Sequence, residues 1–118
     1  MKTTAPPRDR VLCHLNGKDS NTIVCLDART NELRSTVSVE AKDVDGNGMA
    51  LDAVRNQIYL PTGDGVLVLD GDRFAEVGRY GVDPGLASRL ACVDPVTKKL
   101  FVLAGHYEKP ILFVIAIP

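Results

Sequence analysis

The feature that most constrains this chain is a repeat of about 42 residues that contains only short apolar runs and turn-forming residues. Asp94 follows Asp52 by 42 positions, and Phe101 follows Tyr59 by the same distance. A third pair of segments is 43 positions apart. The recurring segments are 48–52 with 89–94, 56–60 with 98–102, and 23–27 with 66–70. Each repeat therefore has the same succession of strands and turns.

Strand-and-turn repeats of about 40 residues are typical of the blades of a β-propeller. The sequence predicts an all-β fold with about 2.5–3 four-stranded blades in the chain. Residues 10–46 and 89–118 are each expected to form a partial blade, and residues 47–88 a full one. Residues 1–9, rich in Pro and Thr, are expected to form a flexible N-terminal arm.

Apolar runs bounded by Gly, Pro, Asn and Asp predict the individual strands. They are Arg10–Leu15, Thr22–Asp27, Glu32–Val39, Met49–Leu51, Gln57–Leu60, Val66–Leu69, Phe74–Tyr80, Leu90–Val93, Lys99–Leu103 and Ile111–Ile117. Residues 104–110 are expected to be a loop. A partial blade at each end suggests that strands from another copy complete the ring.

Charge and hydropathy exclude two classes of partner. The 14 basic residues are scattered among 15 acidic ones, whereas nucleic-acid binding needs clustered Lys and Arg. No apolar run approaches the roughly 20 residues that span a bilayer, and residues 1–10 lack the apolar core of a signal peptide. Cys13, Cys25 and Cys92 lack metal-type spacing and are expected to pack as small apolar side chains. A cytoplasmic protein without nucleic-acid or membrane partners is the prediction, with a truncated secreted protein as the alternative for its location.

The length of the chain, 118 residues, predicts self-association. A closed propeller needs at least about four blades, or roughly 170 residues at this period. An open row of blades would leave apolar faces and strand edges in water. The chain is therefore expected either to form a homodimer with a ring of about five or six blades, or to be a piece of a longer protein.

The repeats resemble the YVTN family of β-propellers, within the wider group that includes NHL-type propellers. Residues 19–33 are similar to the family's strand and turn, sN-x-V-x-V-iD-x-x-T-x-x-V, and residues 48–60 to its G-i-a-l-D … r-x-Y-V half. The resemblance covers roughly residues 10–117, with a departure at Ala116, where the strand-ending Asp is lost. It implies a rigid scaffold whose loops bind ligands or proteins, with enzymes in the minority. Asp27 and Asp70 are expected to cap turns, and Gly48 to supply an unusual backbone angle.

One segment fits the opening of a calcium loop, D-x-[DN]-x-[DN]-G. Its oxygen donors are Asp43, Asp45 and Asn47, at the alternate positions that a tight loop directs at one ion. The closing carboxylate is missing, because Val54 stands where an EF-hand has Glu. Calcium binding and a plain acidic loop between blades are both left open.

A second group of candidate residues follows from topology. In a four-stranded meander, the loops after the second and fourth strands emerge on one face, and loops carry most function in such scaffolds. This face is the expected site for a protein or small-molecule ligand, and a solvated hairpin tip is the alternative. Its candidate residues are His106, Tyr107, Glu108, Asp83, Arg89 and Asp64.

Two functions compete. The first is a non-enzymatic binding or scaffold module that associates with itself, because the chain lacks a G-x-S-x-G motif, a phosphate-binding glycine loop and a convergent catalytic set. The second is a metal-dependent propeller hydrolase, similar to lactonases, with an axial ion held by Asp43, Asp45, Asn47 and His106. The first function is favoured, without a resident cofactor unless calcium binds.

Overall fold

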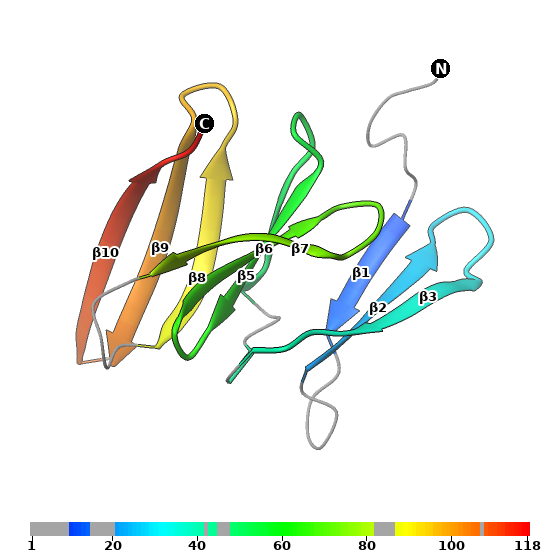
Figure 1. Cartoon of the computed structure of the whole chain (residues 1–118), viewed down its shortest axis with the longest axis horizontal. Coiled ribbons are helices and arrows are strands. Elements are labelled where there is room, and N and C mark those ends of the chain that lie inside the picture. Colours follow the sequence, from blue (N-terminus) through cyan, green and yellow to red (C-terminus); the bar gives the residue numbers. More distant parts are fainter. Residues whose placement is uncertain (1–9, 15–20, 42, 45–47, 82–86, 107) are drawn as a thin grey trace. The chain divides into compact units, whose positions relative to one another are not determined.

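A computed structural model describes residues 10–14, 21–41, 43–44, 48–81, 87–106 and 108–118 (Figure 1). Residues 10–14 and His106 are described by their backbone alone. The chain divides into two compact units, Met1–Glu40 and Ala41–Pro118, which are described here one at a time as unit 1 and unit 2. The expected N-terminal arm, residues 1–9, lies outside the described residues.

Unit 1 contributes one antiparallel sheet with the order β1-β2-β3. Its strands are β1 (Arg10–His14), β2 (Thr22–Asp27) and β3 (Leu33–Ser38). In the central strand the side chains of Ile23 and Cys25 are buried, whereas Val24 and Leu26 are partly exposed. The alternation gives this sheet one buried face and one half-open face, as a period of two requires.

Unit 2 contains two antiparallel sheets, called here the second and third sheets. The second has the order β4-β5-β6-β7, with β4 (Ala50–Asp52), β5 (Gln57–Thr62), β6 (Gly65–Asp70) and β7 (Glu76–Gly81). The third has the order β10-β9-β8, with β8 (Ser88–Asp94), β9 (Lys99–His106) and β10 (Lys109–Ala116).

The all-β prediction is confirmed. The described residues form three open antiparallel sheets and contain no α-helix, hence no helix with the length and apolarity that crossing a bilayer requires. Most predicted strands differ from the observed ones by one to three residues at an end, and two of these differences have a clear cause. The loop expected at residues 104–110 is shorter, because Ala104 pairs with Ile111 and the ladder continues to His106. Strand β7 starts at Glu76 because Phe74 still belongs to the preceding turn, where its N–H donates to the Asp70 carbonyl.

The sequence repeat is also a repeat of register. Pairs of facing residues recur at corresponding places in all three sheets, and successive pairs along a hairpin alternate between its two faces. On one side the corresponding pairs are Val11–Leu26, Ile58–Leu69 and Leu100–Ile115. On the other side they are Leu12–Cys25, Tyr59–Val68 and Phe101–Val114. The three sheets are therefore versions of one structural unit.

The second and third sheets of unit 2 pack against each other through a shared core. The second sheet supplies one face of its central hairpin, and the third sheet supplies the facing residues of β8 and β9 together with Ile117. The buried members are Tyr59, Val66, Val68, Ala91, Leu100, Val102 and Ile117. The opposite face of the second sheet is buried as well, at Ile58, Leu60, Leu67 and Leu69. A hairpin that is apolar on both faces needs a cover on both faces.

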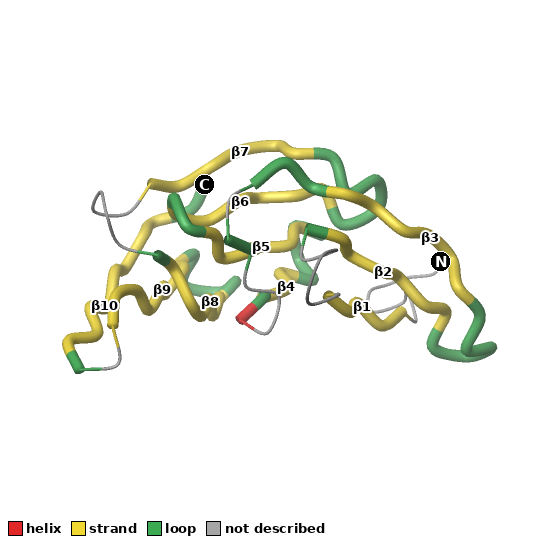
Figure 2. Tube along the Cα trace, turned by 90° about the horizontal axis from the view of Figure 1, so that it is seen from below, coloured by secondary structure: helices red, strands yellow, loops and turns green. Residues whose placement is uncertain are grey.

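The two sheets of unit 2 come closest at β8. Its Cα atoms lie within 8 Å of those of β4, β5 and β6, and Figure 2 shows β4 next to β8 while β7 and β10 lie well apart. Gly48, just before β4, lies against the β8 backbone: a Cβ atom there would lie 2.0 Å from the Arg89 carbonyl oxygen and 2.7 Å from the Leu90 Cα. The prediction that Gly48 supplies an unusual backbone angle was wrong, because its φ is not positive. A glycine is needed there because it permits a close approach of two backbones.

The ends of four strands carry the same turn. The carboxylates of Asp27, Asp52, Asp70 and Asp94 each accept the backbone N–H two residues further on, at 2.8, 2.9, 2.9 and 3.0 Å. Four residues after each Asp, the backbone takes a left-handed conformation, at Asn31, Asn56, Phe74 and Lys98. The expected capping by Asp27 and Asp70 is confirmed, because an Asp oxygen can satisfy the donors that a sharp turn leaves unpaired.

Arg55 ties the two sheets of unit 2 together at these turns. Its Nη1 donates to the Asp52 carboxylate at 2.8 Å, and Asp52 is fully buried. Its Nε donates to the Pro118 carbonyl at 2.9 Å, and Nη1 also reaches the Pro95 carbonyl at 3.5 Å. One side chain thus joins the β4–β5 turn to the β8–β9 turn and to the segment after β10.

We expect Gly48→Ala to destabilise unit 2 by about 1–3 kcal/mol, the usual cost of forcing an extra carbon into a filled space. The Arg89 backbone would have to move to admit the methyl group. Gly78→Ala is the matched control, since a Cβ there meets nothing within 4 Å. Urea unfolding followed by circular dichroism measures both. Equal stabilities for the two variants would contradict the close approach at Gly48.

The turn at Asp94 predicts a dependence of stability on pH. Hydrogen bonds from the Thr97 hydroxyl and the Val96 N–H lower the pKa of Asp94 below its ordinary value of 3.8. A carboxyl group with a lowered folded-state pKa stabilises the protein above its ordinary pKa, and this contribution is lost as the pH falls through the folded value. In Asp94→Asn the amide oxygen can keep the backbone bond but cannot titrate.

The wild-type protein should therefore be more stable than Asp94→Asn at pH 7, and the difference should shrink as the pH falls below about 4. Urea midpoints measured from pH 7 to pH 2.5 test this, and the other acidic groups cancel in the comparison. A difference that stays constant over this range would show that the Asp94 charge is not held by the turn.

Candidate functional site

Several connections gather at one end of unit 2, called here the loop end. Gly65 pairs with both Thr62 and Gly81, which places the β5–β6 turn beside the end of β7. In the third sheet Ser88 pairs with Ala104, so the start of β8 lies beside the end of β9. The ends of the second and fourth strands of the second sheet, β5 and β7, therefore lie at the same end of the sheet, whereas residues 82–86, which follow β7, lie outside the described residues.

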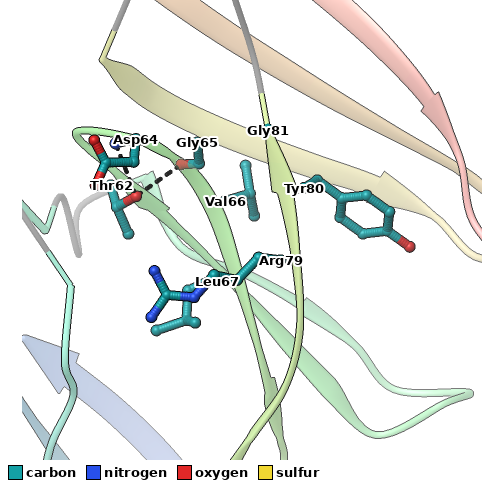
Figure 3. A pocket seen from close by; sticks show the side chains of 8 residues that line it. All are labelled: Thr62, Asp64, Gly65, Val66, Leu67, Arg79, Tyr80 and Gly81. Carbon is teal, nitrogen blue, oxygen red and sulfur yellow. Dashed lines mark hydrogen bonds between the residues drawn. The ribbon is translucent and has the colours of Figure 1, made fainter. Parts of the chain in front are cut away.

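A hollow of about 190 Å³ opens at the loop end of the second sheet (Figure 3). It is formed by the β5–β6 turn together with facing parts of β6 and β7. Its lining residues are Thr62, Asp64, Gly65, Val66, Leu67, Arg79, Tyr80 and Gly81. In the close-up, Thr62 and Asp64 lie together at the turn and Arg79 lies beside Leu67, whereas the ring of Tyr80 points away from them.

The turn that forms this hollow is held by its own hydrogen bonds. The Thr62 hydroxyl donates to the Gly65 carbonyl at 3.2 Å and accepts the N–H of Asp64 at 3.2 Å. Gly65 has a φ of 142°, and a Cβ there would lie 2.2 Å from the Tyr80 carbonyl oxygen. The hydroxyl of Thr62 is therefore occupied within the turn, and the exposed Asp64 carboxylate is the polar group that the turn presents to solvent.

The positive charge in the hollow is neutralised by a neighbour. Arg79 Nε donates to Glu76 Oε2 at 2.6 Å, and Nη2 donates to Oε1 at 3.1 Å. These bonds hold the pKa of Glu76 below its ordinary range. A two-pronged ion pair of this kind orients the guanidinium group and lowers its attraction for an anionic ligand.

At the loop end of the third sheet, the predicted residues are placed as follows. Arg89 lies on β8, and its Nε donates to the Gly105 carbonyl on β9 at 2.5 Å. Glu108 is exposed in the connection between β9 and β10. His106 is the last residue of β9, where its backbone pairs with Lys109. Asp83 and Tyr107 lie outside the described residues. The structure thus brings Asp64, Arg89 and Glu108 to the loop end, on two different sheets.

Sequence reasoning missed Arg79 and Tyr80 as lining residues of the hollow. Both belong to β7, the most polar strand of the full repeat, and Figure 3 shows them next to Gly81. Their position at the end of the strand, opposite the Gly63–Gly65 turn, was a usable signal. Ser88 carries a buried hydroxyl oxygen that has no hydrogen-bond partner among the residues that the structure describes, and the sequence gives no sign of that.

The calcium hypothesis gains no support from the described part of the site. Asp43 is exposed, with a φ of 49°, and Asp45 and Asn47 lie outside the described residues. Asp52, the nearest downstream carboxylate, lies at the far end of β4 and already accepts bonds from Val54, Arg55 and the Arg55 guanidinium group. Within the described ranges, no group of three His, Cys, Asp or Glu residues could hold a metal ion.

Scans against protein-family models, curated proteins and solved structures give no match for this chain. The described residues of the loop end contain no nucleophile hydrogen-bonded to a general base, which is the arrangement that covalent catalysis needs. Buried phenols do not fill that role, because burial raises the pKa of Tyr59 and its hydroxyl donates to Gln57.

We predict that calcium at millimolar concentration gives no saturable heat in a calorimetric titration of the chain, since Asp52 is engaged in its turn and cannot close a calcium loop. Asp43→Asn, which removes one donor charge, should titrate identically. Saturable heat that Asp43→Asn weakens would instead support the calcium loop and reopen the metal-dependent hydrolase.

Proposed function

We propose that this chain is a non-enzymatic binding scaffold of the β-propeller type, similar to YVTN repeats, in which each sheet is one blade or part of one. It completes its ring by associating with a second copy. Its loop end then presents short turns to a protein or small-molecule ligand.

The observation that carries this proposal is the stacking of two sheets with the same register in unit 2. Propeller blades stand radially around an axis, so neighbouring blades approach most closely at their inner strands. The first strands of the two sheets are β4 and β8, and the backbone just before β4 meets β8 at Gly48 and Leu90, which are repeat-equivalent positions 42 residues apart. The outer strands β7 and β10 diverge (Figure 2).

The number of sheets also supports a closed ring. The described residues of each chain form three sheets, of three, four and three strands. Two chains would bring six sheets, within the usual range of about four to eight blades, and a two-fold pair is the commonest symmetry of soluble oligomers.

The dimensions of the loop end favour a particular class of ligand. A drug-sized molecule usually occupies a pocket of roughly 300–1,000 Å³, and the hollow beside Thr62 holds about 190 Å³. Short turns with exposed carboxylates such as Asp64 and Glu108 suit contacts with a protein or peptide that carries a few basic or polar side chains.

Light scattering coupled to size-exclusion chromatography tests the self-association. We expect a particle of twice the 12.7 kDa chain mass, which dissociates on dilution. A folded particle that keeps the mass of one chain at concentrations up to about 100 μM would contradict the proposed ring, because a dissociation constant above that concentration means a weak free energy of association.

A further inference from the structure

The third sheet has an apolar face that points away from the shared core. Alternation along its three strands places every second row of residues on this outer face, and beside the charged row Asp94–Lys99–Ala116 lie two apolar rows. Register defines the rows as Leu90–Leu103–Leu112 and Cys92–Phe101–Val114. Leu112 is 60% exposed and Val114 is 56% exposed, and Leu90 and Cys92 are exposed too. Neither row contains a charged residue, so the face is a contiguous apolar patch of the kind that marks an interaction site.

One repeat earlier, the corresponding face is covered. The pair Phe101–Val114 on the third sheet corresponds in register to the pair Tyr59–Val68 on the second. Tyr59 and Val68 are buried, with 1% and 5% exposure, because the third sheet packs on them in the shared core. This face of the second sheet thus receives another sheet. Within the described residues, no sheet covers the corresponding face of the third sheet.

The kind of sheet that fits this face is also visible in unit 2. The third sheet uses the pairs Leu100–Ile115 and Val102–Phe113 to pack on the second. In the first sheet, the corresponding register positions are Val11–Leu26 and Cys13–Val24. All four are apolar residue types, and Val24 and Leu26 are only partly buried. The first sheet therefore carries, on its half-open face, the counterpart of the surface that covers Tyr59 and Val68.

We propose that the outer face of the third sheet docks onto the Val24 and Leu26 face of the first sheet of a second copy. This inference rests on the proposed function and specifies its contact. The two copies pack head to tail, and the same interface occurs twice in a closed pair. Each contact continues the sheet-on-sheet packing of unit 2 across a molecular boundary, with the apolar rows of one sheet facing those of the next.

The first experiment uses light scattering to compare substitutions at two valines of nearly equal exposure. Val114→Glu places a carboxylate in the middle of the proposed contact, whereas Val77→Glu places one on β7, where Val77 is 55% exposed. We expect Val114→Glu to weaken association on the order of 100-fold or more, because an unpaired charge would be buried, and Val77→Glu to associate like the wild type. Leu112→Glu should repeat the effect of Val114→Glu. Equal effects of Val114→Glu and Val77→Glu would overturn the proposed surface.

The second experiment tests the head-to-tail partner. Val24→Glu should weaken association as strongly as Val114→Glu, since it damages the opposite side of the same contact. A mixture of the two variants retains one intact contact, between the third sheet of Val24→Glu and the first sheet of Val114→Glu. The mixture should therefore form a one-to-one pair although each variant alone does not. Failure to pair would overturn the head-to-tail contact. A Val24→Glu variant that associates like the wild type, while Val114→Glu does not, would also overturn it and would indicate third sheet on third sheet.

The outcomes separate this inference from the proposed function. A wild-type chain that stays monomeric overturns both. A wild-type chain that dimerises and is unaffected by Val114→Glu, Leu112→Glu and Val24→Glu overturns the surface alone and leaves the self-associating scaffold in place. Circular dichroism of each variant confirms that the exposed substitutions leave the strands formed.

Discussion

Burial of both faces of a small apolar sheet is the constraint on which the rest of the structure depends. The β5–β6 hairpin presents Tyr59 and Val68 on one side and Ile58 and Leu69 on the other, and all four side chains are buried. Apolar area in water is unfavourable by roughly 25 cal/mol per Å², so a hairpin of this kind is stable only between two covers. One cover is visible in unit 2, where the third sheet packs on the Tyr59 side. The sequence repeat reproduces this hairpin, which is apolar on both faces, from one sheet to the next.

The turns determine how the sheets of unit 2 can pack on each other. Four strands end in an Asp whose carboxylate captures the backbone N–H two residues on, so each hairpin closes at the same step of the repeat. The turn at Asp52 has a second task, because Arg55 reaches from it to the Pro95 and Pro118 carbonyls. At the other end of β4, Gly48 removes the side chain that would separate the two sheets. Register and spacing between sheets are thereby fixed by few residues.

Much of this architecture could be predicted from the sequence, for reasons that are local. Strands β2 and β5 follow from apolar runs bounded by turn residues, and the Asp-capped turns follow from the recurrence of Asp27, Asp52, Asp70 and Asp94 at strand ends. The shared position of the loops at one end of the second sheet follows from antiparallel order alone. These features depend on residues close together in the chain.

The features that escaped prediction depend on distant neighbours. The need for glycine at position 48 comes from the Arg89 backbone, 41 residues further along the chain. The hollow beside Thr62 exists because Arg79 and Tyr80 return next to the β5–β6 turn, and the orientation of Arg79 is set by its pairing with Glu76. The extension of β9 to His106 depends on pairing with β10. Propensity within one segment contains no information about such contacts.

The measurement that tests the central claim most directly is a nuclear Overhauser spectrum of the folded chain in solution. If repeat-equivalent sheets stack with their first strands closest, the Hα protons of Gly48 will give strong cross-peaks to the Hα proton of Leu90, 42 residues away. A spectrum with the expected cross-strand peaks inside each sheet, such as those between Tyr59 and Val68, but none between Gly48 and either Arg89 or Leu90, would contradict the account.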